Sequence, residues 1–465
     1  MKRASQSMPR ASIRETTVGR VDADVLEYTA GRDRELDVRL VEADCIGSAA
    51  HAVMLARLPL RPPLFTQAEL RRVIAELERL RRRAVAGKFE ITPEDQDAHL
   101  AVERALTRRL GDLGRRIHTG RSRNDQVAVD LRLYGKQQLL DAMTETADLV
   151  ETLIAFARRH ARVPMVGRTH QQPAMPSSVG LWAASYAEGL LDDLGLMRGA
   201  YELNDQCPLG AAAGYGTPLP VDRALTARLL CFARPTHTAL HAIHARGKIE
   251  GAILSALGQV LLTCSRFAQD LMLYSMPEFG YFSLPSEWGT GSSIMPQKNN
   301  PDVLELVRAR CARVLASAQA VLEILRALPG GYNRDVQETK EPFFEGIATT
   351  RATLRILRPL TAAVKVHPDR LRAAFTPDVF AADHALELAA EGVPFREAYR
   401  RVKADLAGLA KRDPDESIIP KTHLGAPMGL DFKALRARAR SASRFAETRR
   451  RAFARAIEKL MHPEE

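Results

Sequence analysis

The chain has 465 residues, 46% of them hydrophobic and 26% charged, as in an ordinary globular protein with a large core. Its formal net charge of +11 comes from arginines that alternate with acidic residues, as in residues 71–78, so we expect no nucleic-acid binding. Aromatic residues make up only 6%, and Ala, Leu and Arg dominate, which favours helices over sheets.

Long helices are predicted along most of the chain. The first starts near Thr66 and repeats apolar residues at helical spacing. Further helical runs cover residues 124–159, 177–205, 247–273, 303–328 and 340–366, and we expect Pro342 and Pro359 to break the last one. Runs that are apolar on more than one side are typical of a helix bundle, because they need burial all round.

The remaining composition bears on compartment and ligands. The five cysteines form no C-x-x-C pair, which predicts reduced core thiols in a cytoplasmic protein and no zinc site. No apolar run looks long enough to cross a bilayer, so we expect no membrane partner. The first 20 or so residues are basic and lack the apolar core of a secretory signal; we expect a flexible tail, with a mitochondrial-type targeting segment as the alternative.

Proline and glycine gather between the helical runs, at residues 163–176, 208–220, 277–301 and 329–331. The polar residues with chemical potential lie in the same places. This pattern predicts a rigid helical scaffold that carries functional loops.

Residues 291–300, with the sequence GSSIMPQKNN, carry two hydroxyls, a cation and amides in ten positions. Pro301 favours the first turn of a helix that should begin at Asp302. A loop with serine and lysine that runs into a helix N-terminus suits an anionic substrate. A nearby lysine also stabilises an oxyanion, so Ser292 or Ser293 can serve as a base or nucleophile.

This segment resembles the signature loop of the fumarase/aspartase superfamily. Four further segments resemble the argininosuccinate lyase family within it, namely residues 119–126, 167–173, 331–335 and 393–399. The resemblance implies a mostly α, three-domain fold with a central long-helix bundle. It places an N-terminal helical domain at 1–120, the bundle with the signature loop at 121–366, and a C-terminal helical domain at 367–465.

The same resemblance implies an activity. Members of that family split argininosuccinate into arginine and fumarate, the last step of arginine synthesis, as homotetramers whose active sites are shared between subunits. Ser292 matches the catalytic base, with Ser293 as its competitor, and His170 matches the acid. Glu305 matches the acidic partner of that histidine, and Lys298 can stabilise both the alkoxide and a substrate carboxylate.

Other positions match residues that hold the substrate. Contacts to the succinyl part or its surroundings are expected from Asn124, Thr169, Asn300, Arg123, Ser48 and His99, and contacts to the arginine end from Tyr332, Gln337 and Lys340. Ser48 has packing and capping as an equal alternative. The chemistry requires only an acid, a base and oxyanion stabilisation, so we expect no metal and no organic cofactor.

The sequence departs from the family pattern at three places. Asp33 stands where many members have a substrate-binding serine, His244-Ala245 replaces a usual Asn-Ser pair, and Asn299 replaces a lysine. Two alternatives therefore stay open. The chain can be a related lyase that releases a different amine from an N-substituted succinate, or a silent homologue of the lens-crystallin kind.

Overall fold

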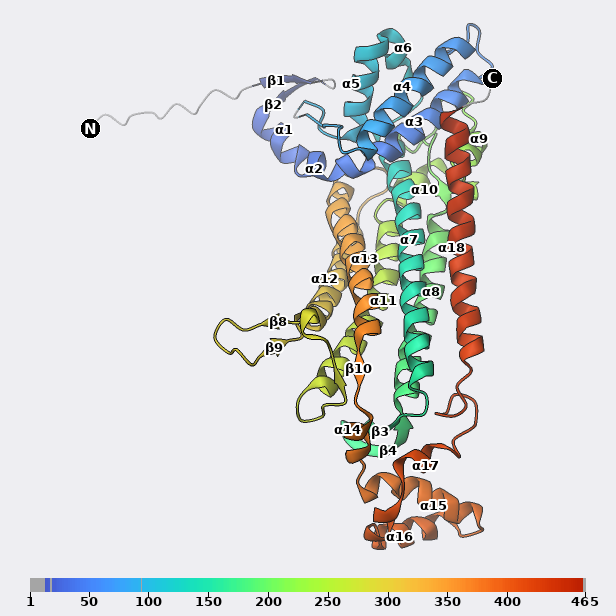
Figure 1. The fold of residues 1–465 in the computed structure, drawn as a ribbon. Helices are drawn as coiled ribbons and strands as arrows, with labels where there is room; N and C mark the ends of the chain where they lie inside the picture. The colour runs from blue at the N-terminus through green and yellow to red at the C-terminus, as the bar shows by residue number, and fades with distance from the viewer. Residues whose placement is uncertain (1–12, 17–18, 93, 463–465) are drawn as a thin grey trace, which may run out of the picture.

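The computed structural model describes residues 13–16, 19–92 and 94–462. The molecule is mostly α, as predicted, and it is elongated, with a helical upper part, a long middle bundle and a small lower part (Figure 1). One hydrophobic core runs continuously from the upper helices through the bundle, so the same packing positions both.

The upper part lies at the end of the bundle where α7 begins. Its helices are α1 (Ala23–Ala30), α2 (Asp33–Asp37), α3 (Val41–Ala56), α4 (Gln67–Val85), α5 (Ala98–Leu110) and α6 (Asp112–Arg115). Thr66 caps α4 with Glu69 in a reciprocal capping box, which explains why the predicted helix begins there. Within the tail expected to be flexible, β1 (Ile13–Thr16) pairs antiparallel with β2 (Gly19–Asp22), while residues 1–12 and 17–18 lie outside the described residues.

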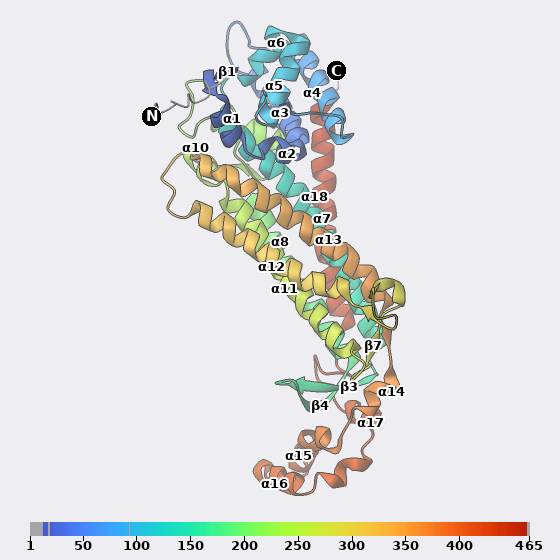
Figure 2. The ribbon, with the colours of Figure 1, turned by 90° about the vertical axis from the view of Figure 1, so that its left-hand side faces the viewer.

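The bundle contains the longest helices of the described chain. They are α7 (Arg123–Arg159), α8 (Val179–Asn204), α11 (Lys248–Ser275), α12 (Asp302–Leu325), α13 (Lys340–Ala363) and α18 (Phe432–Met461). Figure 2 shows them running side by side along the length of the molecule. The five helical runs predicted between residues 124 and 366 match α7, α8, α11, α12 and α13 to within a few residues at each end.

One expected feature of the last of these runs is wrong, because α13 passes unbroken through both prolines. Pro342 lies in the first turn, where a missing N–H costs nothing since it would have no intrahelical partner. Pro359 lies near the C-terminal end, where only one hydrogen bond of the helix is lost. Burial of Leu354, Leu357 and Leu360 around it outweighs that loss.

The expectation that no segment could cross a membrane also needs correction. By length and composition, α11 is apolar enough to do so, with a mean hydropathy of 1.3 over its best window. However, 61% of that window is buried inside the molecule, as for the core helix of a bundle. Burial against α8 and α12 therefore accounts for its apolar character.

The lower part contains α14 (Pro368–Ala373), α15 (Ala381–Ala390), α16 (Phe395–Ala404) and α17 (Pro414–Ile418). Phe380, Ala385, Ala398, Val402 and Leu409 form a small core of their own there. From this part the chain returns upward as α18, which packs along α7 and α8 and ends beside α3 and α4. Residues 432–461 thus lie with the bundle, whereas the three domain boundaries drawn from the sequence stay a prediction.

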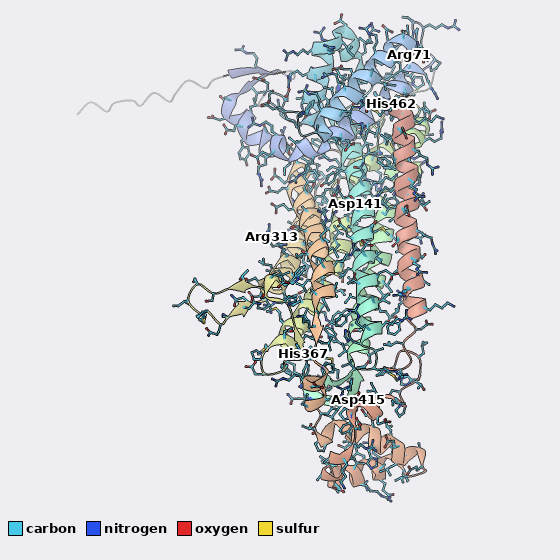
Figure 3. The ribbon with its side chains drawn as sticks, viewed as in Figure 1. Arg71, Asp141, Arg313, His367, Asp415 and His462 are labelled. Carbon is cyan, nitrogen blue, oxygen red and sulfur yellow. The ribbon has the colours of Figure 1, made fainter. Side chains whose placement is uncertain are left out.

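Ion pairs connect the bundle helices at Asp141, which is labelled in Figure 3. Asp141 of α7 forms an ion pair with Arg351 of α13 at 3.0 Å and another with Arg450 of α18 at 3.1 Å.

Further short elements connect the long helices. They are α9 (Arg223–Leu229), α10 (Ala239–His244), the strand pair β5 (Gln206–Cys207) with β6 (Arg234–Pro235), and the pair β7 (Phe282–Ser283) with β10 (Lys365–Val366).

Candidate active site

The signature loop projects from the side of the bundle as a short hairpin (Figure 1). Strand β8 (Thr290–Gly291) pairs antiparallel with β9 (Asn299–Asn300), and α12 begins at Asp302, as the sequence predicted. Gly289 is required where the hairpin closes, because a Cβ there would lie 2.6 Å from the carbonyl oxygen of Asn300. Most of the loop is exposed, including Lys298, whereas Ser292 and Asn300 are half-buried.

The two serines of the loop differ in their surroundings. The hydroxyl oxygen of Ser292 accepts hydrogen bonds from the backbone N–H groups of Ile294 at 3.3 Å and Met295 at 3.1 Å. Donors aimed at an oxygen stabilise its anionic form and so lower the cost of deprotonation. The geometry therefore favours Ser292 over Ser293 as the group that can carry a negative charge. Glu305 lies in the first turn of α12, directly after this loop.

Thr169 and His170 occupy the tip of a β-hairpin at the opposite end of α7 from its start. The sequence suggested only a Pro-rich loop, but β3 (Pro164–Thr169) pairs with β4 (Gln172–Ser178). His170 and Gln171 both adopt positive φ angles, 53° and 62°, in a two-residue turn without glycine. Such backbone strain in non-glycine residues concentrates at functional sites. Both Thr169 and His170 are exposed, so the hairpin presents them outward.

Lys340 lies at the top of α13, in the upper part of the molecule, and its ammonium group is already paired. Its Nζ lies 2.7 Å from carboxylate oxygens of both Asp33 and Asp37. Burial raises the pKa of Asp33 to about 6 and raises that of Asp37 as well, despite the lysine. The departure at Asp33 thus places a second carboxylate on the lysine that was expected to face the arginine end.

Arg123, Tyr332 and Gln337 line the same small cavity as Asp33 and Lys340. Arg123 forms an ion pair with Asp97 at 3.0 Å, and Gln337 donates to the carbonyl oxygen of Thr29 at 3.0 Å. The cavity has a volume of only about 30 Å³, close to that of one water molecule. Asn124 lies next to Arg123, in the first turn of α7. These residues form one cluster, which we call the upper patch.

The second departure from the family pattern has a visible role beside the upper patch. Nε2 of His244 accepts a hydrogen bond from the backbone N–H of Gly331 at 2.7 Å. It thereby holds the turn that presents Tyr332, whose ring also packs under the guanidinium of Arg246 at 5.7 Å. The histidine replaces part of the hydrogen-bonding capacity of the usual Asn-Ser pair, while Ala245 is buried.

Ser48 and His99 are buried and do not line the cavity of the upper patch. The Ser48 hydroxyl accepts from Arg121 at 2.9 Å, which matches the packing alternative. Nε2 of His99 lies 3.3 Å from Nδ1 of His118, and Glu103 lies beside both rings. This His–Glu–His cluster bears on the expectation that the chain binds no metal, because its three side chains bring possible ligand atoms close together. Burial lowers the pKa of His118, and the neighbouring His99 lowers it further.

The predicted site residues therefore fall into three groups, and within one chain the upper patch lies far from the other two. The loop 291–300 and the upper patch lie before and after α12, whose 24 residues extend about 36 Å. Asn124 lies in the first turn of α7 and His170 lies beyond the other end of this helix, whose 37 residues extend about 56 Å. No local rearrangement closes gaps of this size, because the helices between them are packed in the core.

The sequence did not single out several residues of the upper patch. Gln96, Asp97, Arg246 and Arg334 line its cavity, and Asp37 pairs with Lys340. Asp97 precedes an apolar run and caps α5 through Leu100 N–H at 2.9 Å, a signal that was visible in the sequence. The others come from separate elements, so only the fold reveals them. The pairing of His99 with Glu103 at an i,i+4 spacing was likewise readable, but His118 was not.

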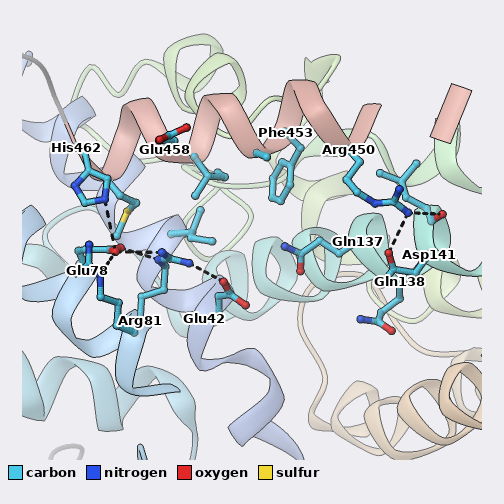
Figure 4. A pocket seen from close by; sticks show the side chains of 16 residues that line it. Glu42, Glu78, Arg81, Gln137, Gln138, Asp141, Arg450, Phe453, Glu458 and His462 are labelled. Atoms are coloured by element: carbon cyan, nitrogen blue, oxygen red, sulfur yellow. Dashed lines mark hydrogen bonds and ion pairs between the residues drawn. The ribbon is translucent and has the colours of Figure 1, made fainter. Parts of the chain in front are cut away.

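A larger cavity of about 580 Å³ lies elsewhere, between α4, α7 and the end of α18 (Figure 4). Glu78 sits there between Arg81 and His462, and Asp141 is bonded to Arg450. None of the residues predicted for catalysis or substrate binding lines it. Its charges are largely paired with one another, so it contributes nothing to the candidate site.

Comparison with known proteins places these groups in context. A family described as "Lyase" matches residues 19–316. Argininosuccinate lyase of Sorangium cellulosum (strain So ce56) is 45% identical over 412 residues, covering 89% of this chain and 95% of that protein. Argininosuccinate lyase of Stenotrophomonas maltophilia (strain K279a) is 42% identical over 420 residues, covering 90% and 96%.

Solved structures agree in fold. EDDS lyase in complex with formate superimposes with a TM-score of 0.74 at 22% identity, over 94% of both chains. Class II fumarase from Schistosoma mansoni gives a TM-score of 0.67 at 15% identity, over 88% of this chain and 100% of that one. With a family match over most of its length and relatives above 40% identity, the chain belongs to the argininosuccinate lyase family of the fumarase/aspartase superfamily.

Proposed function

We propose that the chain eliminates arginine from argininosuccinate to give fumarate. The single observation that carries this proposal is the similarity to argininosuccinate lyases along about nine-tenths of the chain. The reaction removes a proton from the carbon beside a carboxylate and then breaks the adjacent C–N bond. It needs a base, a stabiliser for the doubly charged carboxylate, and an acid for the departing nitrogen.

Ser292 is the base in this proposal. Its oxygen already accepts two backbone N–H groups, which would stabilise the alkoxide before the substrate arrives. Lys298 of the same loop adds a positive charge that would stabilise the negative charge on the substrate carboxylate. The N-terminus of α12, two residues after Asn300, would act in the same way. These groups, with Asn300 and Thr169, bind the succinyl carboxylates as electron density accumulates there.

His170 is the proposed acid, which keeps the leaving guanidinium of arginine protonated while the C–N bond breaks. Glu305 serves as the carboxylate that orients this histidine. The upper patch, through Tyr332, Gln337 and Lys340, receives the arginine end, with Asn124 and Arg123 nearby. Ser48 and His99 are buried and act indirectly, Ser48 by accepting a hydrogen bond from Arg121.

The active unit in this proposal is a homotetramer in which each site combines the signature loop, the His170 hairpin and the upper patch from different chains. The separations of about 36 Å and 56 Å support it, because they exceed any substrate of this class. Leu306, Leu315 and Leu322 of α12 are 50%, 39% and 47% exposed and offer apolar surface for subunit contact. The five free thiols suit a reducing compartment, so we place the reaction in the cytoplasm.

The decisive experiment follows fumarate release from argininosuccinate by ultraviolet absorbance. Wild type is compared with Ser292→Ala and with Ser293→Ala, its neighbour in the same loop. We expect Ser292→Ala to lower kcat by about 10²–10⁴-fold, the usual contribution of a general base, and Ser293→Ala to keep most activity. A reversed pattern would move the base to Ser293.

A second candidate substrate class rests on Asp33, whose carboxylate lines the patch that receives the leaving group. Asp33 pairs with Lys340 and offsets its positive charge, so the carboxylate of arginine would be held less strongly, and an amine without that carboxylate becomes a candidate leaving group. If folded, oligomeric wild type releases no fumarate from argininosuccinate, other N-substituted succinates become the substrates to test. Absence of fumarate from every such compound would point to a silent homologue.

A further inference from the structure

A cluster of three ligand-bearing side chains lies where α5 meets the short 3-10 turn Arg116–His118, outside the residues assigned to catalysis. Nε2 of His99 lies 3.3 Å from Nδ1 of His118. Oε2 of Glu103 lies 3.9 Å from the first nitrogen and 3.7 Å from the second. The three atoms form a nearly equilateral triangle, although they come from two separate elements.

The size of this triangle matches a transition-metal site. A point equidistant from atoms with these three separations lies about 2.1 Å from each of them, the bond length of Zn²⁺ to imidazole nitrogen and carboxylate oxygen. Two imidazoles and one carboxylate are also a ligand set that zinc-type ions accept, with a further position left for water.

A simple hydrogen bond between the two histidines explains the arrangement less well. It would use only Nε2 of His99 and Nδ1 of His118 and would leave the Glu103 oxygen beyond hydrogen-bonding distance of both. A cation among the three atoms engages all of them at once. The carboxylate would then offset the positive charge of the ion instead of lying beside two rings to which it makes no hydrogen bond.

The surroundings of His99 fit a ligand role. Its other nitrogen, Nδ1, is buried, has no hydrogen-bond partner among the described residues, and faces Asp44 at 3.7 Å. A carboxylate behind a histidine is the usual arrangement that orients a metal-bound imidazole. His99 is 2% exposed, whereas the side chain of His118 is 46% exposed, so an ion can enter from solvent.

We propose that His99, Glu103 and His118 bind one divalent transition-metal ion of the Zn²⁺ class. The ion ties α5 to the segment that leads into α7 and so braces the upper patch, because Asp97, two residues before His99, pairs with Arg123. Its role is positional, since these ligands are not among the groups that move protons in the reaction. The proposal stands whether or not argininosuccinate is the substrate.

The test uses the full chain, stripped with a chelator and dialysed, and titrates Zn²⁺ by calorimetry. Glu103→Gln and His118→Gln are compared with His384→Gln, a control histidine that lies 3.2 Å from Glu387 without a third ligand. We expect one equivalent per wild-type and control chain, and at least roughly a tenfold loss of affinity in each ligand variant. Unchanged binding in both ligand variants, or no equivalent in wild type, would overturn the proposal.

A second measurement does not depend on the variants folding. X-ray absorption of the Zn²⁺-loaded wild type counts imidazole ligands directly, and Co²⁺ substitution gives the intense visible bands of a four-coordinate site. The proposal requires two imidazoles and low coordination number. Any other imidazole count, or an octahedral Co²⁺ spectrum, contradicts the assignment even if an equivalent of metal is bound.

Discussion

Mixing two inactive variants tests whether active sites are shared between chains. Ser292→Ala removes the proposed base in the signature loop, and Gln337→Ala alters the upper patch beyond the other end of α12. If each site takes these residues from different chains, random mixing in equal amounts leaves both intact in about one site in four, so about 25% of wild-type activity returns. If one chain supplied both, every site would keep one defect.

The assay is fumarate release after the two variants are denatured together, refolded and purified as tetramers. The matched control mixes Gln337→Ala with Arg123→Gln, because both residues line one cavity of one chain and no mixed site would regain both. Recovery near a quarter in the first mixture and none in the control supports sharing. Failure of the first mixture to exceed its two parents would refute the reasoning from the 36 Å helix.

His244→Ala removes the acceptor for Gly331 N–H, at a cost of about 1 kcal/mol, so steady-state kinetics should show KM raised roughly fivefold with kcat less affected. Gly289→Ala places a Cβ against Asn300 and displaces the loop, which should lower kcat while thermal melting stays near wild type. Burial raises the pKa of Asp33 from 3.8 to about 6 in the folded state, so between these values the folded state binds more protons than the unfolded state. Wild type should therefore lose stability relative to Asp33→Asn as the pH rises from 4 to 6, which urea midpoints would show. A flat difference across that range would contradict the burial argument.

Two departures from the family pattern, Asp33 and His244, bear on which amine the enzyme releases. Asp33 binds Lys340, so the positive charge expected at the arginine end is offset within the protein. His244 takes over the support of the Tyr332 turn. If the upper patch receives the leaving amine as proposed, these two departures change amine preference, whereas the third, Asn299, lies in the signature loop itself.

The sequence by itself determined the helical architecture and supplied a prediction of which loop residues carry the chemistry. Apolar residues on several sides of each long run required burial, and that requirement produced α7, α8, α11, α12 and α13 close to the expected bounds. Residues 291–300 were predicted to take part in catalysis because they combine residue types that are rarely combined for packing alone. Pro301 was sufficient to predict that α12 begins at Asp302, because the start of a helix depends on residues that are neighbours in the sequence.

Only the tertiary structure decided which distant residues meet. The pairing of Lys340 with Asp33 and the triangle of His99, Glu103 and His118 join separate elements, and no local pattern encodes such contacts. The hairpin under His170 was also missed, because its turn uses two non-glycine residues at positive φ, which short-range preferences disfavour. The lengths of α7 and α12 were readable from the sequence, but that they hold the site residues apart followed only from their packing in the core.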